Sequence, residues 1–226
     1  MLLFAVLLAV ILGVVQFFSE QIINTCGNYY THVISFSAGI SITYVFVDLF
    51  PHFSRSVVQF DQILFVTVLF GFIFVHLVEK YVYQHSSDTL LDERLQNLNQ
   101  FISFFYHMVL GIVIFDFTEQ GLIEALLIFI PILIFTAVST LPVRRHPSSL
   151  VHLFVSSSTV IGVVLAGIFI DYLQGFVQIG LVGFVIGGLL FSVIRHSIPQ
   201  GKKGKPLMFI LGVIIYTPIV LWTFTL

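Results

Sequence analysis

The chain is divided into eight long stretches that contain no Asp, Glu, Lys or Arg. These stretches cover residues 2–19, 21–47, 62–78, 95–115, 125–143, 146–170, 172–194 and 206–226. A helix needs about 20 mainly apolar residues to cross a bilayer, and each stretch is near that length. The alternating apolar and polar residues of a membrane β-barrel are absent from the sequence. The pattern predicts an all-α, polytopic membrane protein with eight transmembrane helices in one domain over residues 1–226.

Composition excludes the other broad classes of protein. Of the 226 residues, 58% are hydrophobic and only 9% are charged, which is too little charge to cover a soluble domain and too much apolar surface for a disordered chain. A net charge of −2 leaves no basic patch for nucleic acid. The lone Cys26 excludes an internal disulfide and a cysteine-based metal site. We expect a location in a cell membrane of the bacterial inner-membrane type, with lipid as the main partner.

The basic residues predict the orientation of the helices. With the N-terminus outside, the segments that follow the first, third, fifth and seventh helices are cytoplasmic, and among the nine Lys and Arg residues only Arg55 lies outside. Basic residues accumulate on the cytoplasmic side of membrane proteins. This distribution predicts an N-out, C-out topology with a cytoplasmic loop at residues 83–100. The cytoplasmic set is Lys80, Arg94, Arg144, Arg145, Arg195, Lys202, Lys203 and Lys205.

Two of the stretches share a pattern that predicts an internal repeat. Phe36-x-x-Gly39 is followed twelve residues later by Pro51, and Phe184-x-x-Gly187 is followed twelve residues later by Pro199. In the predicted topology the two stretches run in opposite directions, so the pair would form an inverted repeat, which is common in transporters. The alternative is that both helices independently use small residues for close packing.

Several segments resemble the ZIP (Zrt/Irt-like) family of metal transporters over essentially the whole chain. The second stretch, from Ser37-Ala38-Gly39 to Asp48-Leu49-Phe50-Pro51, resembles the family's Ala-Gly helix that ends in Leu-Pro-Glu. The third, from Phe70-Gly71-Phe72-Ile73 to Val78-Glu79-Lys80, resembles its Gly-Phe helix, and Gly183-Phe184 to Ile198-Pro199 and the Gly212 helix resemble its last two. The resemblance implies transport of a divalent cation of the zinc, iron or manganese class, with no resident cofactor.

The metal-binding motifs of that family are mostly missing from this sequence. The resemblance places them on the fourth and fifth helices, where His107 is kept but Met108 and Gly111 replace the family's amide and carboxylate. On the fifth helix only Pro131 is kept, and residues 125–143 contain no carboxylate and no imidazole. A divalent cation that loses its water shell needs such ligands. The usual binuclear site is therefore expected to be missing even if the helices are retained.

The remaining polar residues of the stretches supply the candidate sites. Asp48 and His52 lie four residues apart, on one face of a helix, and either capture a cation or lie exposed at the membrane surface. His107 is the best single candidate for a transport-pathway residue, with burial against a neighbouring helix as the alternative. We predict His107, Asp48 and His52 as metal ligands. Further pathway or entrance candidates are Asp116, Glu119, Glu124, Thr136 and Ser139.

Other polar groups have simpler interpretations. His76 and Glu79 beside Lys80 are expected to reach toward the cytoplasmic surface. The hydroxyl quartet at residues 156–159 is expected to support helix packing, with a lining role as the alternative.

The sequence leaves two functions open. One is transport of a divalent cation or another small solute. The other is a non-transporting membrane scaffold or sensor that keeps the transporter fold. No motif for an enzyme is present, and a homodimer is open.

Overall fold

The computed structural model describes residues 1–85, 91–138, 149–173, 175–197 and 204–224. Every element within these ranges is helical, and no described residue belongs to a strand. The fold is therefore all-α, as the sequence predicts. The α-helices are α1 (Leu2–Cys26), α2 (Tyr30–Tyr44), α3 (Phe50–Phe60), α4 (Phe65–His85), α5 (Leu91–Gln120), α6 (Leu122–Val138), α7 (Ser149–Ser156), α8 (Ser158–Leu173), α9 (Phe176–Ser192) and α10 (Pro206–Thr223). Two π-helices, η2 (Val45–Leu49) and η4 (Val193–Ser197), and two short 3-10 helices, η1 (Gly27–Tyr29) and η3 (Gln62–Leu64), complete the described elements.

Five helical segments are long and apolar enough to cross a membrane, by length and composition. They are Leu2–Ser19, Gln21–Phe60, Gln100–Gln120, Phe176–Arg195 and Pro206–Thr223. A sixth results if Leu150–Ser156 and Ser158–Phe169, which are bent by 45° from one another, form one span. Two shorter apolar helices are Gln62–Val78 and Leu122–Val138. These segments are those of a membrane protein, and each falls within or overlaps one of the charge-free stretches of the sequence.

Two boundaries differ from the sequence expectation. Pro51 does not end the second helix, because the helical turns continue through the π-helix η2 into α3, with this proline in the first turn of α3. The helix therefore continues to Phe60. The loop expected at residues 83–100 is shorter, since α4 extends to His85 and α5 begins at Leu91.

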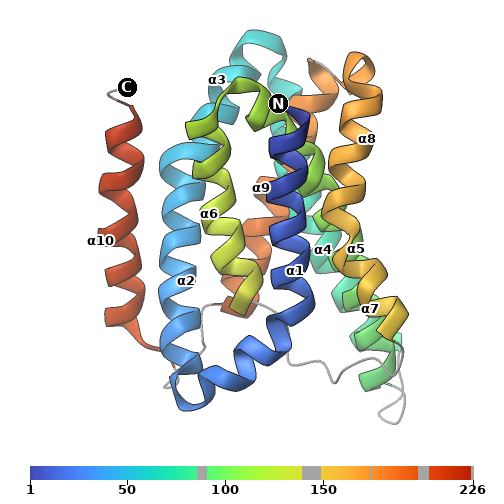
Figure 1. Ribbon diagram of the computed structural model, residues 1–226, viewed down its shortest axis with the longest axis vertical. Helices are drawn as coiled ribbons and strands as arrows, with labels where there is room; N and C mark the ends of the chain where they lie inside the picture. The colour runs from blue at the N-terminus through green and yellow to red at the C-terminus, as the bar shows by residue number, and fades with distance from the viewer. Residues whose placement is uncertain (86–90, 139–148, 174, 198–203, 225–226) are drawn as a thin grey trace.

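Successive long helices run in opposite directions (Figure 1). The start of α1 and the end of α10 lie at the same end of the bundle, at the top of Figure 1, which we call the upper end. Helix α1 contacts α5, α6 and α8, and α5 also contacts α6 and α8. The most extensive helix contacts are those of α4 with α9, α2 with α10, and α5 with α8.

Glycines bring α2 and α10 into direct backbone contact. A Cβ atom on Gly39 would meet the carbonyl of Phe209 in α10, and a Cβ on Gly212 would meet the carbonyl of Phe36 in α2. Because each helix presents its glycine to the other backbone, no larger residue fits at either position. Small residues allow this close approach in membrane helix pairs.

The same reciprocal contact joins α4 and α9. A Cβ on Gly71 would meet the carbonyl of Phe184, and a Cβ on Gly187 would meet the carbonyl of Val68. A third pair, Gly111 of α5 and Gly162 of α8, makes an equivalent contact. Each of the three extensive helix contacts is therefore built on a glycine from both partners.

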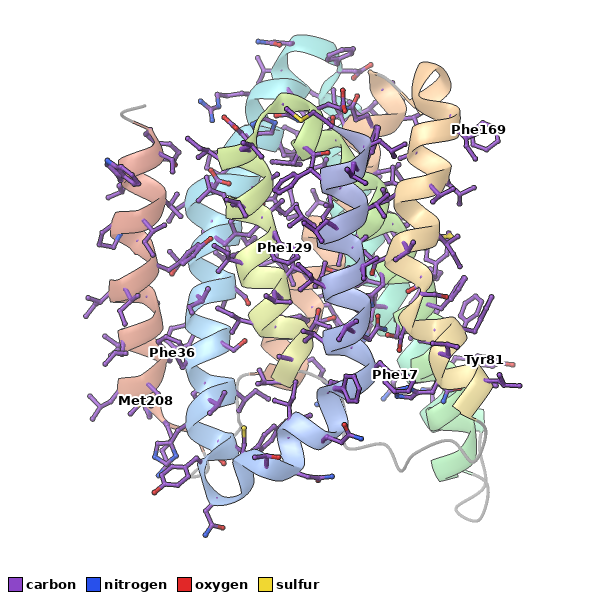
Figure 2. The ribbon with its side chains drawn as sticks, in the orientation of Figure 1. Phe17, Phe36, Tyr81, Phe129, Phe169 and Met208 are labelled. Carbon is purple, nitrogen blue, oxygen red and sulfur yellow. The ribbon has the colours of Figure 1, made fainter. Side chains whose placement is uncertain are left out.

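The outer surface of the bundle carries large apolar side chains. Phe169 is 47% exposed and projects away from the bundle, whereas Phe129 is 6% exposed and lies among the central helices (Figure 2). Large apolar side chains are exposed along most of the described helices, which is rare on soluble monomers but suits a surface in contact with lipid. Leu3 and Leu207, at 85% and 79% exposure, are extreme cases.

Candidate functional site

A polar network centred on His107 crosses three helices of the bundle. The Nδ1 atom of His107 lies 2.8 Å from the backbone carbonyl of Ser103, one turn earlier in α5. A carbonyl only accepts hydrogen bonds, so Nδ1 carries the proton and Nε2 has the free lone pair. The hydroxyl of Thr136 in α6 lies 3.5 Å from Nε2, at the outer limit of a hydrogen bond. The imidazole is therefore held firmly on one side and only weakly on the other.

Gln16 of α1 completes this network. Its Nε2 donates to the Ser103 hydroxyl at 3.0 Å, across 87 residues of sequence. The Gln16 side chain is 6% exposed, and its Oε1 atom has no hydrogen-bond partner among the described residues. An unpartnered buried amide oxygen costs about 1–3 kcal/mol. We name Gln16, Ser103, His107 and Thr136 together the His107 site.

Further hydroxyls without partners lie in α8, which packs against both α1 and α5. Ser158 and Thr159 are fully buried, and neither hydroxyl has a hydrogen-bond partner among the described residues. The preceding serines are used differently. Ser156 donates to the carbonyl of His152 and Ser157 to that of Phe154, both at 2.8 Å. Such bonds to the preceding turn favour bends in helices, and these two lie at the break between α7 and α8.

The backbone carbonyl that Pro131 leaves without a helical donor already accepts a hydrogen bond from another helix. Proline has no N–H, so the carbonyl of Leu127, four residues earlier, loses its helical donor. The Tyr216 hydroxyl of α10 donates to this carbonyl at 2.9 Å. Helix α6 therefore offers no free carbonyl at Leu127, and the bond attaches α6 to the α2–α10 pair.

Asp48 and His52 lie at the junction between α2 and α3, on other helices than the residues of the His107 site. Asp48 belongs to η2 and His52 to α3, and both are half-buried. The His52 ring packs against Phe117 with a centroid distance of 5.3 Å. Arg55 and Glu124 lie within electrostatic range of both side chains. The structure therefore brings Asp48, His52 and Glu124 into one neighbourhood, together with the guanidinium group of Arg55.

Asp116 and Glu119 belong to a second acidic group. They line a cavity of about 360 Å³ between α5, α8 and α9. The Asp116 carboxylate accepts hydrogen bonds from Gln178 of α9 and, at 3.1 Å, from Gln120. The three acidic entrance candidates are thus divided, with Asp116 and Glu119 at this cavity and Glu124 in the Asp48 neighbourhood.

The described residues contain no group of three or more His, Cys, Asp or Glu side chains that could hold a metal ion. Asp116 is nine positions after His107 on α5, about 13 Å along the helix axis. His107 as a metal ligand therefore stays a prediction without a partner of that kind in the described part of the chain. Ser139 lies outside the described residues. The His76 ring packs against Phe191, with centroids 5.6 Å apart.

Sequence reasoning found His107 and Thr136 but missed Gln16, Ser103, Gln178 and Tyr216. The available signals were weak. Gln16 is the one carboxamide in the charge-free stretch 2–19, and Ser103 precedes His107 by one helical turn.

The comparisons with known proteins found no relatives. No family model, no curated protein and no solved structure matches the chain.

Proposed function

We propose that the protein is a ZIP-like membrane transporter that carries a small solute past the His107 site. The observation that carries this proposal is the network of Gln16, Ser103, His107 and Thr136, which joins three helices inside the bundle. Polar side chains within membrane helices are costly and are kept mainly where they serve a pathway or a site. The resemblance implies divalent cations of the zinc, iron and manganese class as the cargo.

The proposed topology has eight membrane spans, with the N-terminus and the C-terminus both on the outer side. The alternating directions of the helices support it, as does the common end at which α1 begins and α10 ends (Figure 1). The 17 residues of α6 measure about 26 Å, which is near the thickness of the hydrocarbon layer. Helix α4 ends and α10 begins toward the opposite, lower end (Figure 1); Lys80 is near the end of α4 and Lys205 precedes α10, which agrees with the positive-inside rule for a cytoplasmic face.

Two register details support an inverted repeat. The π-helices η2 and η4 each begin nine residues after the Phe of the Phe-x-x-Gly motif in their segment. The carbonyls of Phe36 and Phe184 also play the same part, since each faces a glycine of the partner helix, Gly212 or Gly71. Independent use of small residues would not be expected to reproduce both features at the same spacing.

Flux into proteoliposomes tests the proposed function. Zinc, manganese, iron and small neutral solutes are offered in turn to vesicles that contain wild-type protein or the His107→Ala variant. Flux of at least one solute that depends on His107 is expected. No flux of any solute above that of empty vesicles, with correctly inserted protein, would contradict the proposal.

The second candidate function is a non-transporting scaffold or sensor that keeps the fold. It is favoured by the lack of a metal-ligand group of three among the described residues. Stable co-purification with a partner protein, together with silent flux assays, would support this alternative.

A further inference from the structure

We infer that the His107 site binds a small uncharged solute with two or more N–H or O–H groups, of the urea type. The inference rests on the proposed transport function and concerns its substrate class. It follows from which donors and acceptors the site leaves free, and from the charges that the site lacks.

The first free group is the Nε2 atom of His107. Because Nδ1–H donates to the Ser103 carbonyl at 2.8 Å, the neutral ring presents a lone pair at Nε2. The 3.5 Å separation from the Thr136 hydroxyl leaves this lone pair poorly satisfied. A solute N–H or O–H group would be a better donor.

The second free group is Oε1 of Gln16. The amide is oriented by the bond from its Nε2 to Ser103 at 3.0 Å, so Oε1 remains as an acceptor. It is buried and has no partner among the described residues. Two unsatisfied acceptors connected through Ser103 match a solute that carries two donors.

Charge argues against a divalent cation at this position. The four side chains of the site are an amide, two hydroxyls and an imidazole that is neutral when Nε2 is unprotonated. Among the acids of α5 whose side chains the structure describes, the nearest along the helix is Asp116, nine positions after His107, and no group of three or more His, Cys, Asp or Glu side chains in the described part of the chain could hold a metal ion. A buried ion without a compensating charge is far more costly than a neutral solute that makes hydrogen bonds.

The neighbouring helix has the same chemical character. Ser158 and Thr159 of α8 contribute fully buried hydroxyls with no partner in the described part of the chain. Amide and hydroxyl groups exchange hydrogen bonds with a neutral solute one after another without stabilising any charge. Buried groups of this kind are better suited to uncharged polar molecules than to ions.

Urea is the probe for the test. Stopped-flow light scattering measures urea entry into proteoliposomes, and a zinc-sensitive dye enclosed in parallel vesicles measures zinc entry. Wild-type protein is expected to accelerate urea entry above empty vesicles and to leave zinc entry unchanged. The Gln16→Met variant is expected to lower the protein-dependent urea rate by about tenfold, the loss of one buried hydrogen bond.

The control is Gln21→Met, because Gln21 is an exposed glutamine on the same helix. Its urea rate should equal that of the wild type, and both variants should elute as the wild type does in size-exclusion chromatography. Zinc entry without urea entry would overturn the inferred substrate class and leave the proposed transport function intact. If correctly inserted wild-type protein accelerates the entry of neither urea nor zinc, the inferred substrate class is overturned. If it also fails to accelerate the entry of the other cations and neutral solutes, the proposed transport function is overturned too. Equal urea rates in the wild type and Gln16→Met would remove the His107 site from the pathway.

Discussion

The Tyr216 hydroxyl donates a hydrogen bond to the Leu127 carbonyl at 2.9 Å, and this is the carbonyl that Pro131 leaves without a helical donor. Tyr216 is 2% exposed, so water does not replace it readily. A proline in the middle of α6 is therefore tolerated because a side chain from another helix supplies the missing bond.

Tyr216→Phe is expected to destabilise the protein, since it leaves the Leu127 carbonyl buried without a donor. The expected loss is about 1–3 kcal/mol. Thermal unfolding in detergent should show a lower midpoint. The matched control is Tyr29→Phe, because Tyr29 is 73% exposed and should lose its hydroxyl without effect. Equal midpoints for the two variants would show that the Tyr216 bond contributes nothing.

Pro131→Ala should interact energetically with Tyr216→Phe. Alanine restores a backbone N–H that can reach the Leu127 carbonyl, so the tyrosine hydroxyl is then no longer the sole donor. In a double-mutant cycle, Tyr216→Phe is expected to cost less in the Pro131→Ala background than in the wild type. Purely additive effects would contradict the exchange of donors at this carbonyl.

Gly187→Ala is expected to weaken the α4–α9 contact. Its Cβ would meet the carbonyl of Val68 and, at 2.6 Å, the amide nitrogen of Phe72, neither of which can move without shifting the helix. Overpacking of this kind costs about 1–3 kcal/mol. Gly180→Ala on the same helix is the control, since its Cβ would make ordinary contacts at 3.6 Å and beyond. Unfolding midpoints of the two variants should differ, with Gly187→Ala the lower.

The proposed inverted repeat predicts the same result at the equivalent position. Gly39→Ala brings a Cβ against the carbonyl of Phe209 and the amide nitrogen of Val213, at 3.2 Å. Its loss of stability should be similar to that of Gly187→Ala in the same unfolding assay. A large destabilisation at one site and none at the other would indicate that the two contacts are not equivalent.

The proposed topology can be checked by labelling in whole cells. In a Cys26→Ser background, Val58→Cys is placed in α3, which lies at the upper end of the bundle, and Gln84→Cys in the last turn of α4, which ends toward the lower end (Figure 1). A membrane-impermeant maleimide should label position 58 in intact cells and position 84 only after permeabilisation. The reverse pattern would show that the protein has the opposite orientation. Labelling of both positions in intact cells would contradict a membrane span between them.

The helices were largely predictable from the sequence, because length and hydrophobicity are local properties. Each charge-free stretch contains or overlaps a described helix, and the Phe-x-x-Gly motifs mark two glycines in backbone contact. The π-helices were not predictable, since a five-residue turn leaves no periodic signal in an apolar segment.

The candidate site was only half predictable for a different reason. A histidine in a membrane segment is conspicuous by itself, whereas Gln16 and Ser103 gain meaning only from their contact across 87 residues. Pairing between helices depends on the three-dimensional arrangement. One sequence gives little information on which polar side chains face one another.

The reciprocal glycine contacts also restrict how the bundle can move. Within each of the α2–α10, α4–α9 and α5–α8 pairs, backbone rests directly on backbone at the glycines. A slide by one residue would replace hydrogen with a methyl or larger group at the point of contact, and steric overlap would block it. Each pair is therefore expected to move as one rigid body, because its two glycines fix the register of the helices. A rearrangement of the bundle would then change the contacts between the pairs and leave the contacts within them unchanged.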